Sequence, residues 1–417
     1  MTDSVQLITE MGQKARAAFT MLAGASDAQK SEALNAAAKH LRASQTAILA
    51  ANQRDMESAR DRKLSDAMLD RLMIDAGRLE AIASAVEHVA KLPDPVGQII
   101  DRSERSNGLV MERIRVPLGV IGIIYESRPN VTADAAALAL RSGNAVILRG
   151  GSEAIESNRA IFDAMAAGVV EAGLPEHAIQ LVQTTDRAAV GAMLKATGLI
   201  DIIIPRGGKS LVKRVQDEAR VPILAHLDGI NHTYIGKDAD PDKAIAIAVN
   251  AKMRRTGICG AMETLLIDQD YPAPGPLVRA LIDAGCEVRG DDAVLELDER
   301  IVSADAADWD TEYLAPIAAV AMVNGLDEAL DHIAQHGSHH TDVIVTENMA
   351  VAEEFIQRAD SAIVMHNASS QFADGGEFGL GAEIGISTGR MHARGPVALE
   401  GLTTYKWVVR GTGQVRP

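Results

Sequence analysis

The feature that most constrains the fold is a regular alternation of strand-length apolar runs with helix-length segments, which begins at Gly119. The runs are rich in Val and Ile and are bounded by Gly, Pro or polar residues, which is typical of buried strands. Helices that connect consecutive buried strands favour parallel pairing with right-handed crossovers. The pattern therefore predicts an α/β protein built on doubly wound parallel sheets.

The alternation divides into two series. The first has predicted strands at 120–125, 144–149, 179–182 and 200–204, with helices at 131–141, 153–171 and 187–195. The second has strands at 262–267, 316–323 and 342–346, with helices at 241–252, 276–284 and 326–335. Two such series predict two Rossmann-like domains, which suits a chain of 417 residues.

Three segments lie outside this alternation. Residues 1–100 have the three-to-four apolar spacing of helices, with a capping-box pattern from Ser26 to Gln29. Residues 100–118 alternate charged and smaller side chains around Asn107-Gly108, which indicates a charged β-hairpin. The stretch 375–389 is rich in glycine, so we expect it to be a loop.

Charge and composition limit the partners. The 41 Lys and Arg against 57 Asp and Glu give a net charge of −16, which disfavours a protein that covers nucleic acid or an anionic membrane. The apolar runs are far shorter than the ~20 residues of a membrane span, and residues 1–6 lack the basic and apolar regions of a secretory signal. We therefore expect a cytoplasmic protein with no nucleic-acid or membrane partner and with both cysteines reduced.

Cys259 is the candidate nucleophile. It lies between Gly257 and Gly260, soon after Arg254 and Arg255 and directly before an apolar strand. A thiol in that setting favours exposure and a lowered pKa. The alternative is a small buried hydrophobe, which is what most free cysteines are. Cys286, at a helix end before a strand, fits the alternative well, and two cysteines are too few for a zinc ribbon or a disulfide framework.

Two glycine loops are candidate anion sites. Gly150-Gly151-Ser152-Glu153 and Gly207-Gly208-Lys209-Ser210 each follow a predicted strand and open a helix. Backbone N–H groups at helix N-termini suit phosphate groups. Neither loop is a complete dinucleotide or Walker motif, so an ordinary turn between strand and helix is the alternative.

The histidine-rich run 332–340 has one feature of a zinc site, since His332 and His336 are one helical turn apart. No glutamate follows His332, however, and Gly337 is expected to end the helix and turn His339 and His340 away. Histidines at a helix end are favourable without any metal. We predict no metal site there.

Six motifs, collinear from Arg115 onward, together resemble the aldehyde dehydrogenase superfamily. They are Arg115-Val116-Pro117-Leu118-Gly119-Val120, Arg128-Pro129-Asn130, the segment 138–148, Ala172-Gly173-Leu174-Pro175, Thr256-Gly257-Ile258-Cys259 and Glu312-Tyr313-Leu314-Ala315-Pro316. Segments 125–130, 257–264, 332–346 and 379–407 are similar to the glutamate-5-semialdehyde dehydrogenase family within it. The histidine-rich run is then a family segment rather than a zinc site.

The resemblance implies a three-part organisation and a reaction. Residues 1–100 and 119–227 would form a cofactor-binding domain, 228–396 a catalytic domain, and 101–118 with 397–417 an oligomerisation element of a homo-oligomer. The implied reaction is NADPH-dependent reduction of L-glutamyl 5-phosphate to L-glutamate 5-semialdehyde and phosphate, the second step of proline biosynthesis from glutamate. A glutamate 5-kinase that channels this substrate is the implied protein partner.

The resemblance also implies roles for single residues. Cys259 would form a thioester, and the Asn130 side chain with the Cys259 backbone N–H would hold the oxyanion. The implied cofactor contacts are Arg149, Ser152, Glu153, Gly207, Gly208 and Glu312. Arg149 replaces the lysine of oxidative members, where it could meet a 2′-phosphate or form a structural salt bridge.

Two further departures from the superfamily pattern bear on the chemistry. His226-Leu227-Asp228-Gly229 stands where oxidative members have E-L-G-G, whose glutamate activates water, so the hydrolytic base is expected to be absent. Leu314 replaces a bulky aromatic, and no function follows from it.

Three rival functions remain open at this point. Within enzymes they are another acyl-phosphate or acyl-CoA reductase and a hydrolytic semialdehyde dehydrogenase. From another class, the chain could be a non-catalytic binding protein on the same scaffold. The last would be expected to lack Cys259 or Asn130, and both are present.

Overall fold

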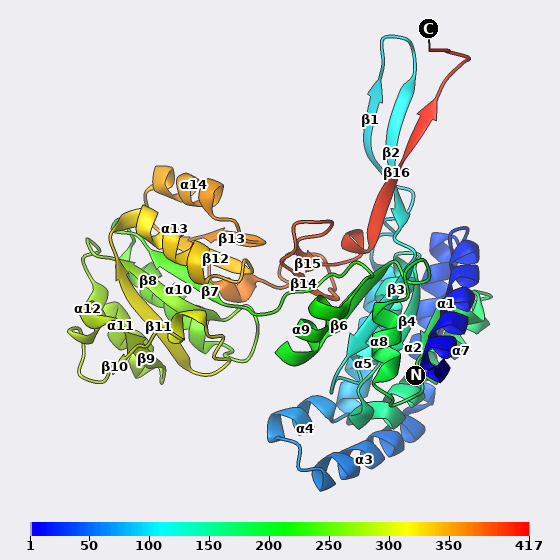
Figure 1. Cartoon of the computed structure of the whole chain (residues 1–417), viewed down its shortest axis with the longest axis horizontal. Coiled ribbons are helices and arrows are strands. Elements are labelled where there is room, and N and C mark those ends of the chain that lie inside the picture. The colour runs from blue at the N-terminus through cyan, green and yellow to red at the C-terminus, as the bar shows by residue number, and fades with distance from the viewer. Residues whose placement is uncertain (1, 417) are drawn as a thin grey trace. The chain divides into compact units, whose positions relative to one another are not determined.

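The computed structural model describes residues 2–416 and contains two compact units (Figure 1). The first runs to Ala225 and also includes Leu380–Gly385 and the C-terminal segment from Val397. The second comprises His226–Gly379 and Ile386–Pro396. Each unit contains its own parallel sheet, so the predicted α/β fold class is confirmed.

The sheet of the first unit has four parallel strands in the order β5-β4-β3-β6. They are β3 (Val120–Tyr125), β4 (Ala145–Arg149), β5 (Ile179–Leu181) and β6 (Ile202–Arg206). The helices that follow them are α6 (Val131–Arg141), α7 (Ile155–Glu171), α8 (Ala188–Leu194) and α9 (Lys209–Glu218). Every residue of β3, β4 and β5 is buried, which is why these strands read as continuous apolar runs.

The N-terminal helices add to both sides of this arrangement. They are α1 (Thr2–Leu22), α2 (Asp27–Ala43), α3 (Gln45–Asp61), α4 (Asp66–Leu72) and α5 (Ala76–Lys91). The predicted capping box is present, with reciprocal hydrogen bonds between Ser26 and Gln29 at the start of α2. α1 packs against α8, whereas α2 and α5 pack against α6 and α7, so the helices form two groups around the sheet.

A three-stranded antiparallel ribbon projects from the first unit (Figure 1). It pairs β1 (Ile99–Glu104) with β2 (Val110–Pro117), and β2 with the C-terminal β16 (Thr403–Arg410). Gly108 has φ +82 at the turn, a value that favours glycine, and the Asn107 side chain accepts the Leu109 N–H at 3.2 Å. The predicted hairpin and its pairing with the C-terminal segment are confirmed.

The second unit contains a seven-stranded parallel sheet in the order β10-β9-β11-β8-β7-β12-β13. The strands are β7 (Asn231–Ile235), β8 (Met262–Asp268), β9 (Glu287–Gly290), β10 (Val302–Ser303), β11 (Ile317–Val323), β12 (Thr341–Val345) and β13 (Ile363–His366). The helices are α10 (Pro241–Met253), α11 (Pro274–Asp283), α12 (Asp292–Leu295), α13 (Gly325–His336) and α14 (Met349–Arg358). All three strands predicted for the second series are present as β8, β11 and β12.

Several details differ from the sequence prediction, which also lacks β10, β13, α12 and α14. β7 was not predicted because Asn231, His232 and Thr233 make it look polar, although all five of its residues are buried. The stretch expected to be a loop contains β14 (Gly385–Ser387), which pairs with β15 (Gly395–Val397); burying Ile386 outweighs the local glycine content. The helix expected from 153 begins with a 3-10 turn (Ser152–Ala154) and becomes α-helical at Ile155.

Across residues 2–416, no helix has the length and apolar character that crossing a membrane requires.

Candidate active site

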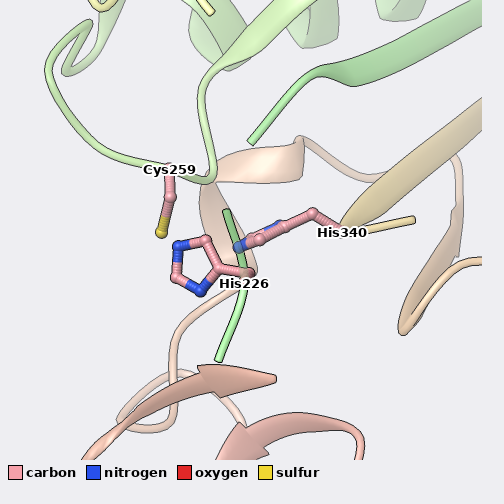
Figure 2. A group of neighbouring side chains, drawn as sticks. All are labelled: His226, Cys259 and His340. Carbon is pink, nitrogen blue, oxygen red and sulfur yellow. The ribbon is translucent and has the colours of Figure 1, made fainter. Parts of the chain in front are cut away.

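Three side chains meet at one edge of the seven-stranded sheet. Cys259 precedes β8, His226 precedes β7, and His340 precedes β12 directly. These strands are neighbours in the order β8-β7-β12 and run parallel, so their amino ends share one edge. The Cys259 sulfur and one nitrogen of each histidine all lie within 4.8 Å of one another (Figure 2). The topology thus brings together three residues of which the outer two, His226 and His340, are more than 100 positions apart.

The backbone around Cys259 is fixed by Asn231, the first residue of β7. The Asn231 amide nitrogen donates to the carbonyl oxygens of Cys259 at 2.6 Å and Ala261 at 2.7 Å. Its oxygen accepts the Thr341 N–H at 3.1 Å. A Cβ on Gly229 would lie 2.3 Å from the Cys259 carbonyl oxygen, so the close approach requires glycine. The Cys259 side chain is half-buried and forms no disulfide.

A buried ion pair joins the two ends of the Cys259 loop. Lys252 in the last turn of α10 lies 2.6 Å from Glu263 in β8, and their side chains are 0% and 1% exposed. Burial raises the pKa of Glu263, and Lys252 opposes that rise. The backbone N–H of Leu314 also donates to Glu263. The pair therefore ties the Cys259 loop to the segment that contains Glu312.

The environment of His226 selects its tautomer. Its Nδ1 lies 2.8 Å from the Ile386 carbonyl oxygen. A carbonyl only accepts hydrogen bonds, so Nδ1 carries the hydrogen and Nε2 of the neutral ring has a lone pair. Figure 2 shows one ring nitrogen of His226 directed at the Cys259 sulfur and the other directed away. The nitrogen that faces the sulfur is therefore Nε2, a proton acceptor.

His340 is the least exposed member of the cluster, at 0%. Its Nδ1 lies 2.9 Å from Thr341 Oγ1, and among residues 2–416 its Nε2 has no hydrogen-bond partner. Burial, with a smaller contribution from His226, lowers the pKa of His340 to about 3, so this ring is neutral at pH 7. The two rings meet edge to face with centroids 5.0 Å apart.

Glu312 lies beside the same loop. Its carboxylate accepts the Gly229 N–H at 3.0 Å. Leu314, two residues further on, has φ +51 and a 44% exposed side chain. Leu314, which replaces the bulky aromatic of the superfamily, therefore lies in a left-handed turn at the surface of this unit.

Asn130 lies in the first unit, at the N-terminus of α6. Its side chain donates to Asp134 at 2.8 Å, and burial raises the pKa of Asp134 to about 6. Asn130 makes no capping hydrogen bond to the backbone of α6 within the part of the chain that is described. It lines a cavity of about 300 Å³ together with Asp134, Arg71, Arg78 and apolar side chains of the N-terminal helices. Asn130 is thus positioned by Asp134 and faces a space that can hold a small molecule.

Arg149 ends β4 at the carboxyl edge of the four-stranded sheet. Its guanidinium donates to the carbonyl oxygens of Gly150 at 2.9 Å and Thr185 at 3.3 Å, and the residue is 7% exposed. Burial lowers the pKa of Arg149, while Glu153 and Glu126 oppose that change. The Arg149 side chain thus holds the Gly150-Gly151 turn through its hydrogen bond to the Gly150 carbonyl.

Glu153 connects the ends of β3 and β4. Its Oε1 accepts the Ser127 N–H at 2.5 Å and the Ser127 hydroxyl at 3.0 Å. Ser127 has φ +47, so the hydrogen bonds hold a turn of left-handed backbone. Ser152, next to Glu153, has an exposed side chain on the same turn.

Gly207 and Gly208 follow β6 and open α9 at the same carboxyl edge. The Gly208 N–H donates to Glu126 at 3.3 Å, and a Cβ on Gly207 would lie 2.5 Å from that carboxylate. A Cβ on Gly208 would meet nothing within 4 Å, and Lys209 and Ser210 are exposed. Gly208 occupies the N-cap position of α9, and as a glycine it has no side chain to cap the helix. A helix N-terminus followed by a lysine suits an anionic group, and here the Glu126 carboxylate already accepts the Gly208 N–H.

The structure separates the histidine-rich run into two environments. His332 and His336 remain on α13, with ring centroids 4.7 Å apart and His336 Nδ1 2.8 Å from Asp310. The chain turns after Gly337 as expected, and His340 reaches the Cys259 cluster, which was not predicted. Within the described residues that cluster is the one group of three potential metal ligands found.

Sequence reasoning missed His340, Asn231 and the Lys252–Glu263 pair. All four lie at or near ends of β7, β8 and β12, and the neighbouring order of these strands is not visible without β7. One signal for this cluster was present in the sequence, because His226 replaces a catalytic glutamate of the superfamily motif.

Comparison with known proteins gives one consistent result. A sequence model described as the aldehyde dehydrogenase family matches residues 3–292. A gamma-glutamyl phosphate reductase of Rhizorhabdus wittichii is 67% identical over 415 residues, which cover 100% of this chain and 97% of that protein. One from Sphingopyxis alaskensis is 69% identical, with coverage of 100% and 97%.

The solved structures agree with this result. The crystal structure of a gamma-glutamyl phosphate reductase from Thermotoga maritima superimposes with a TM-score of 0.96 at 42% identity, covering 98% of this chain and 100% of that one. An acetylating aldehyde dehydrogenase from Geobacillus thermoglucosidasius has a TM-score of 0.70 at 18% identity, covering 100% and 99%, which is a likeness of fold alone.

Proposed function

This chain belongs to the aldehyde dehydrogenase family and, within it, to the gamma-glutamyl phosphate reductases, and on that premise we propose that it reduces L-glutamyl 5-phosphate to L-glutamate 5-semialdehyde with NADPH. The observation that carries the proposal is the half-buried Cys259 thiol, held by Asn231 in a fixed loop beside a proton-accepting histidine. A nucleophile so positioned can accept an acyl group from an acyl phosphate, since phosphate is a good leaving group.

The covalent step needs little from the rest of the site. The Cys259 sulfur attacks the acyl carbon, and phosphate leaves with the electron pair of the C–O bond. The Cys259 backbone N–H and the Asn130 side chain are the proposed donors to the oxyanion of the tetrahedral intermediate. Because His226 stands where oxidative relatives have a glutamate, we propose that water is a poor acyl acceptor and phosphate a good one.

The family implies a nicotinamide cofactor, which supplies hydride to the thioester carbon when bound. The proposed contacts in the first unit are Ser152 and Glu153 after β4, Gly207 and Gly208 before α9, and Arg149 beneath the glycine turn. Arg149 adds positive charge at this edge, and the preference for NADPH over NADH follows from the family resemblance alone. Glu312 in the second unit is the proposed partner of the nicotinamide ribose.

The proposal extends to partners and location. A cytoplasmic enzyme that consumes an acyl phosphate needs a kinase to make it, and the lability of acyl phosphates favours channelling from glutamate 5-kinase. The ribbon of β1, β2 and β16 is the proposed oligomerisation element of a homo-oligomer.

The test follows the reverse reaction, because the semialdehyde is stable enough to supply. Purified protein is given semialdehyde and NADP⁺ with phosphate, coenzyme A or neither, and NADPH formation is recorded. We expect phosphate alone to support rapid turnover, and Cys259→Ala to reduce it on the order of 10⁴-fold or more. Cys286→Ala is the matched control, since Cys286 is 3% exposed and burial raises the pKa of its thiol to about 11.

Two results would contradict the proposal. Turnover with water or coenzyme A that equals turnover with phosphate would indicate one of the other acyl chemistries. Appreciable turnover by folded Cys259→Ala would remove Cys259 from the mechanism.

A further inference from the structure

We propose that His226 is the proton partner of Cys259, so that the free enzyme holds a thiolate–imidazolium pair at the amino ends of β7 and β8. The inference rests on the proposed function only in naming Cys259 as the nucleophile. His226 stands at the position where oxidative relatives have a glutamate, and here it would exchange a proton with the Cys259 sulfur. His226 would then be a catalytic residue, since it faces a reacting atom (Figure 2).

The orientation of His226 supports this role. The Ile386 carbonyl oxygen, 2.8 Å away, holds the hydrogen of Nδ1 and directs Nε2 at the sulfur. A histidine oriented through Nδ1 by an acceptor, with Nε2 at the nucleophile, is the arrangement that general-base chemistry needs. Loop 229–231 fixes the Cys259 backbone from the same segment of chain, so the two partners are positioned together.

His340 cannot take the proton in place of His226. It is 0% exposed, and among residues 2–416 no acidic group pairs with it. Its neutral ring packs edge to face on His226. An imidazolium on His226 keeps a hydrogen-bonded carbonyl, whereas an imidazolium on His340 would be buried without one.

Charged groups of both signs lie in the chain segments that hold the pair. Asp228 is two residues along the same segment, and Glu312 accepts the Gly229 N–H. Arg254 and Arg255 lie in the Cys259 loop, and Arg254 donates to Gln371 at 3.4 Å. Within the proposal, a carboxylate near the ring would favour the imidazolium and a guanidinium near the sulfur would favour the thiolate.

Protons and electrons balance with one further reactant, the cofactor hydride of the proposed function, which would add to the thioester carbon before the aldehyde is released. The S–H bond breaks and its proton moves to Nε2. The S–C bond forms as the bond from carbon to the phosphate oxygen breaks, and the departing phosphate takes a proton from the imidazolium. When the C–S bond breaks at aldehyde release, its electron pair stays on sulfur, and His226 takes a proton from solvent to restore the pair.

The test is the rate at which iodoacetamide alkylates Cys259 between pH 5 and pH 10, in the full chain with EDTA present and the adduct located by mass spectrometry. We expect the wild-type rate to retain a plateau below the usual thiol pKa of about 8.5. His226→Gln should lose the plateau and react at least about 10-fold more slowly at pH 6.5, following a single ordinary thiol titration.

His366→Gln is the matched control. His366 is half-buried in the same unit, and its Nε2 also lies 2.9 Å from a backbone carbonyl, that of Thr346. It should react as the wild type does. His226→Asn is a second variant in case His226→Gln does not fold, with folding checked by near-ultraviolet circular dichroism.

The outcomes separate this inference from the proposed function. A His226→Gln profile that coincides with the wild-type profile overturns the pairing, even if turnover still depends on Cys259. A lost plateau in His226→Gln supports the pairing, even if the protein does not reduce glutamyl phosphate.

Discussion

At the scale of single residues, Asn130 offers the sharpest separation of catalysis from stability. Its side chain does not cap α6 through any described hydrogen bond, so truncation costs only its hydrogen bond to the buried Asp134. As an oxyanion donor, however, it would be worth about 10²–10³ in kcat. We therefore predict that Asn130→Ala lowers kcat by that factor in the phosphate-dependent assay, while stability falls by about 1–3 kcal/mol because Asp134 loses its hydrogen-bond donor.

Asn348 is a control of the opposite kind. Its Oδ1 accepts the N–H groups of Ala350 at 3.2 Å and Val351 at 3.4 Å, so it does cap α14. Asn348→Ala should cost about 1 kcal/mol of stability and leave kcat unchanged. The role of Asn130 is refuted if Asn130→Ala behaves like Asn348→Ala.

The residues that sequence reasoning could and could not identify differ in one respect. Cys259, Asn130 and the glycine turns lie in short local motifs, which one stretch of sequence displays. His340 and Asn231 act through neighbours more than 25 positions away, at 2.6–3.1 Å in the case of Asn231. Their roles depend on the order of strands in the sheet, which local patterns do not contain.

At the scale of elements, the ion pair between α10 and β8 determines how firmly the Cys259 loop is held. Glu263→Gln would leave the Lys252 ammonium buried without a counter-charge, and breaking such a pair costs about 3–5 kcal/mol. We predict a large fall in the midpoint of urea denaturation, followed by circular dichroism.

The double variant Lys252→Met with Glu263→Met is the informative comparison. It removes both charges and fills similar volume, so it should recover most of the stability lost in Glu263→Gln. A Glu263→Gln midpoint equal to that of the wild type would show that the pair does not hold the loop.

The elements themselves were predictable where burial and apolar pattern agree. α6 was predicted with its observed bounds, Val131–Arg141, because ten of its eleven residues are buried and a glycine follows it closely. β7 was missed because its buried Asn231, His232 and Thr233 are polar. The Asn231 side chain bonds to Cys259 and Ala261, which offsets the cost of its burial, whereas the ring nitrogens of His232 and the hydroxyl of Thr233 have no hydrogen-bond partner among residues 2–416. Polar strands of this kind are selected by function, so apolar periodicity does not find them.

At the scale of the whole molecule, the candidate functional residues lie at the carboxyl edge of one sheet and at the amino edge of the other. The candidate cofactor residues follow the carboxyl ends of β3, β4 and β6, as expected for an open α/β sheet. The Cys259 cluster instead precedes the amino ends of β7, β8 and β12. The net charge of −16 is therefore compatible with anionic ligands only because backbone N–H groups, Arg149 and Lys209 supply local donors at these edges.

The ribbon gives the prediction that belongs to the assembled protein. β16 exposes Tyr405, Trp407 and Val409 by 47%, 53% and 52%, and alternate positions of a strand share one face. Arg113 stacks on the first two rings at 5.3 and 5.7 Å, so the exposed face is ordered before any partner arrives. If this face forms the oligomer contact, Trp407→Glu should shift sedimentation at micromolar concentration to a smaller species without changing the circular dichroism spectrum.

Thr404→Glu adds the same charge to the opposite face of β16 and should sediment like the wild type. A wild-type monomer, or a Trp407→Glu variant that sediments unchanged, would exclude this face of the ribbon as the oligomerisation element.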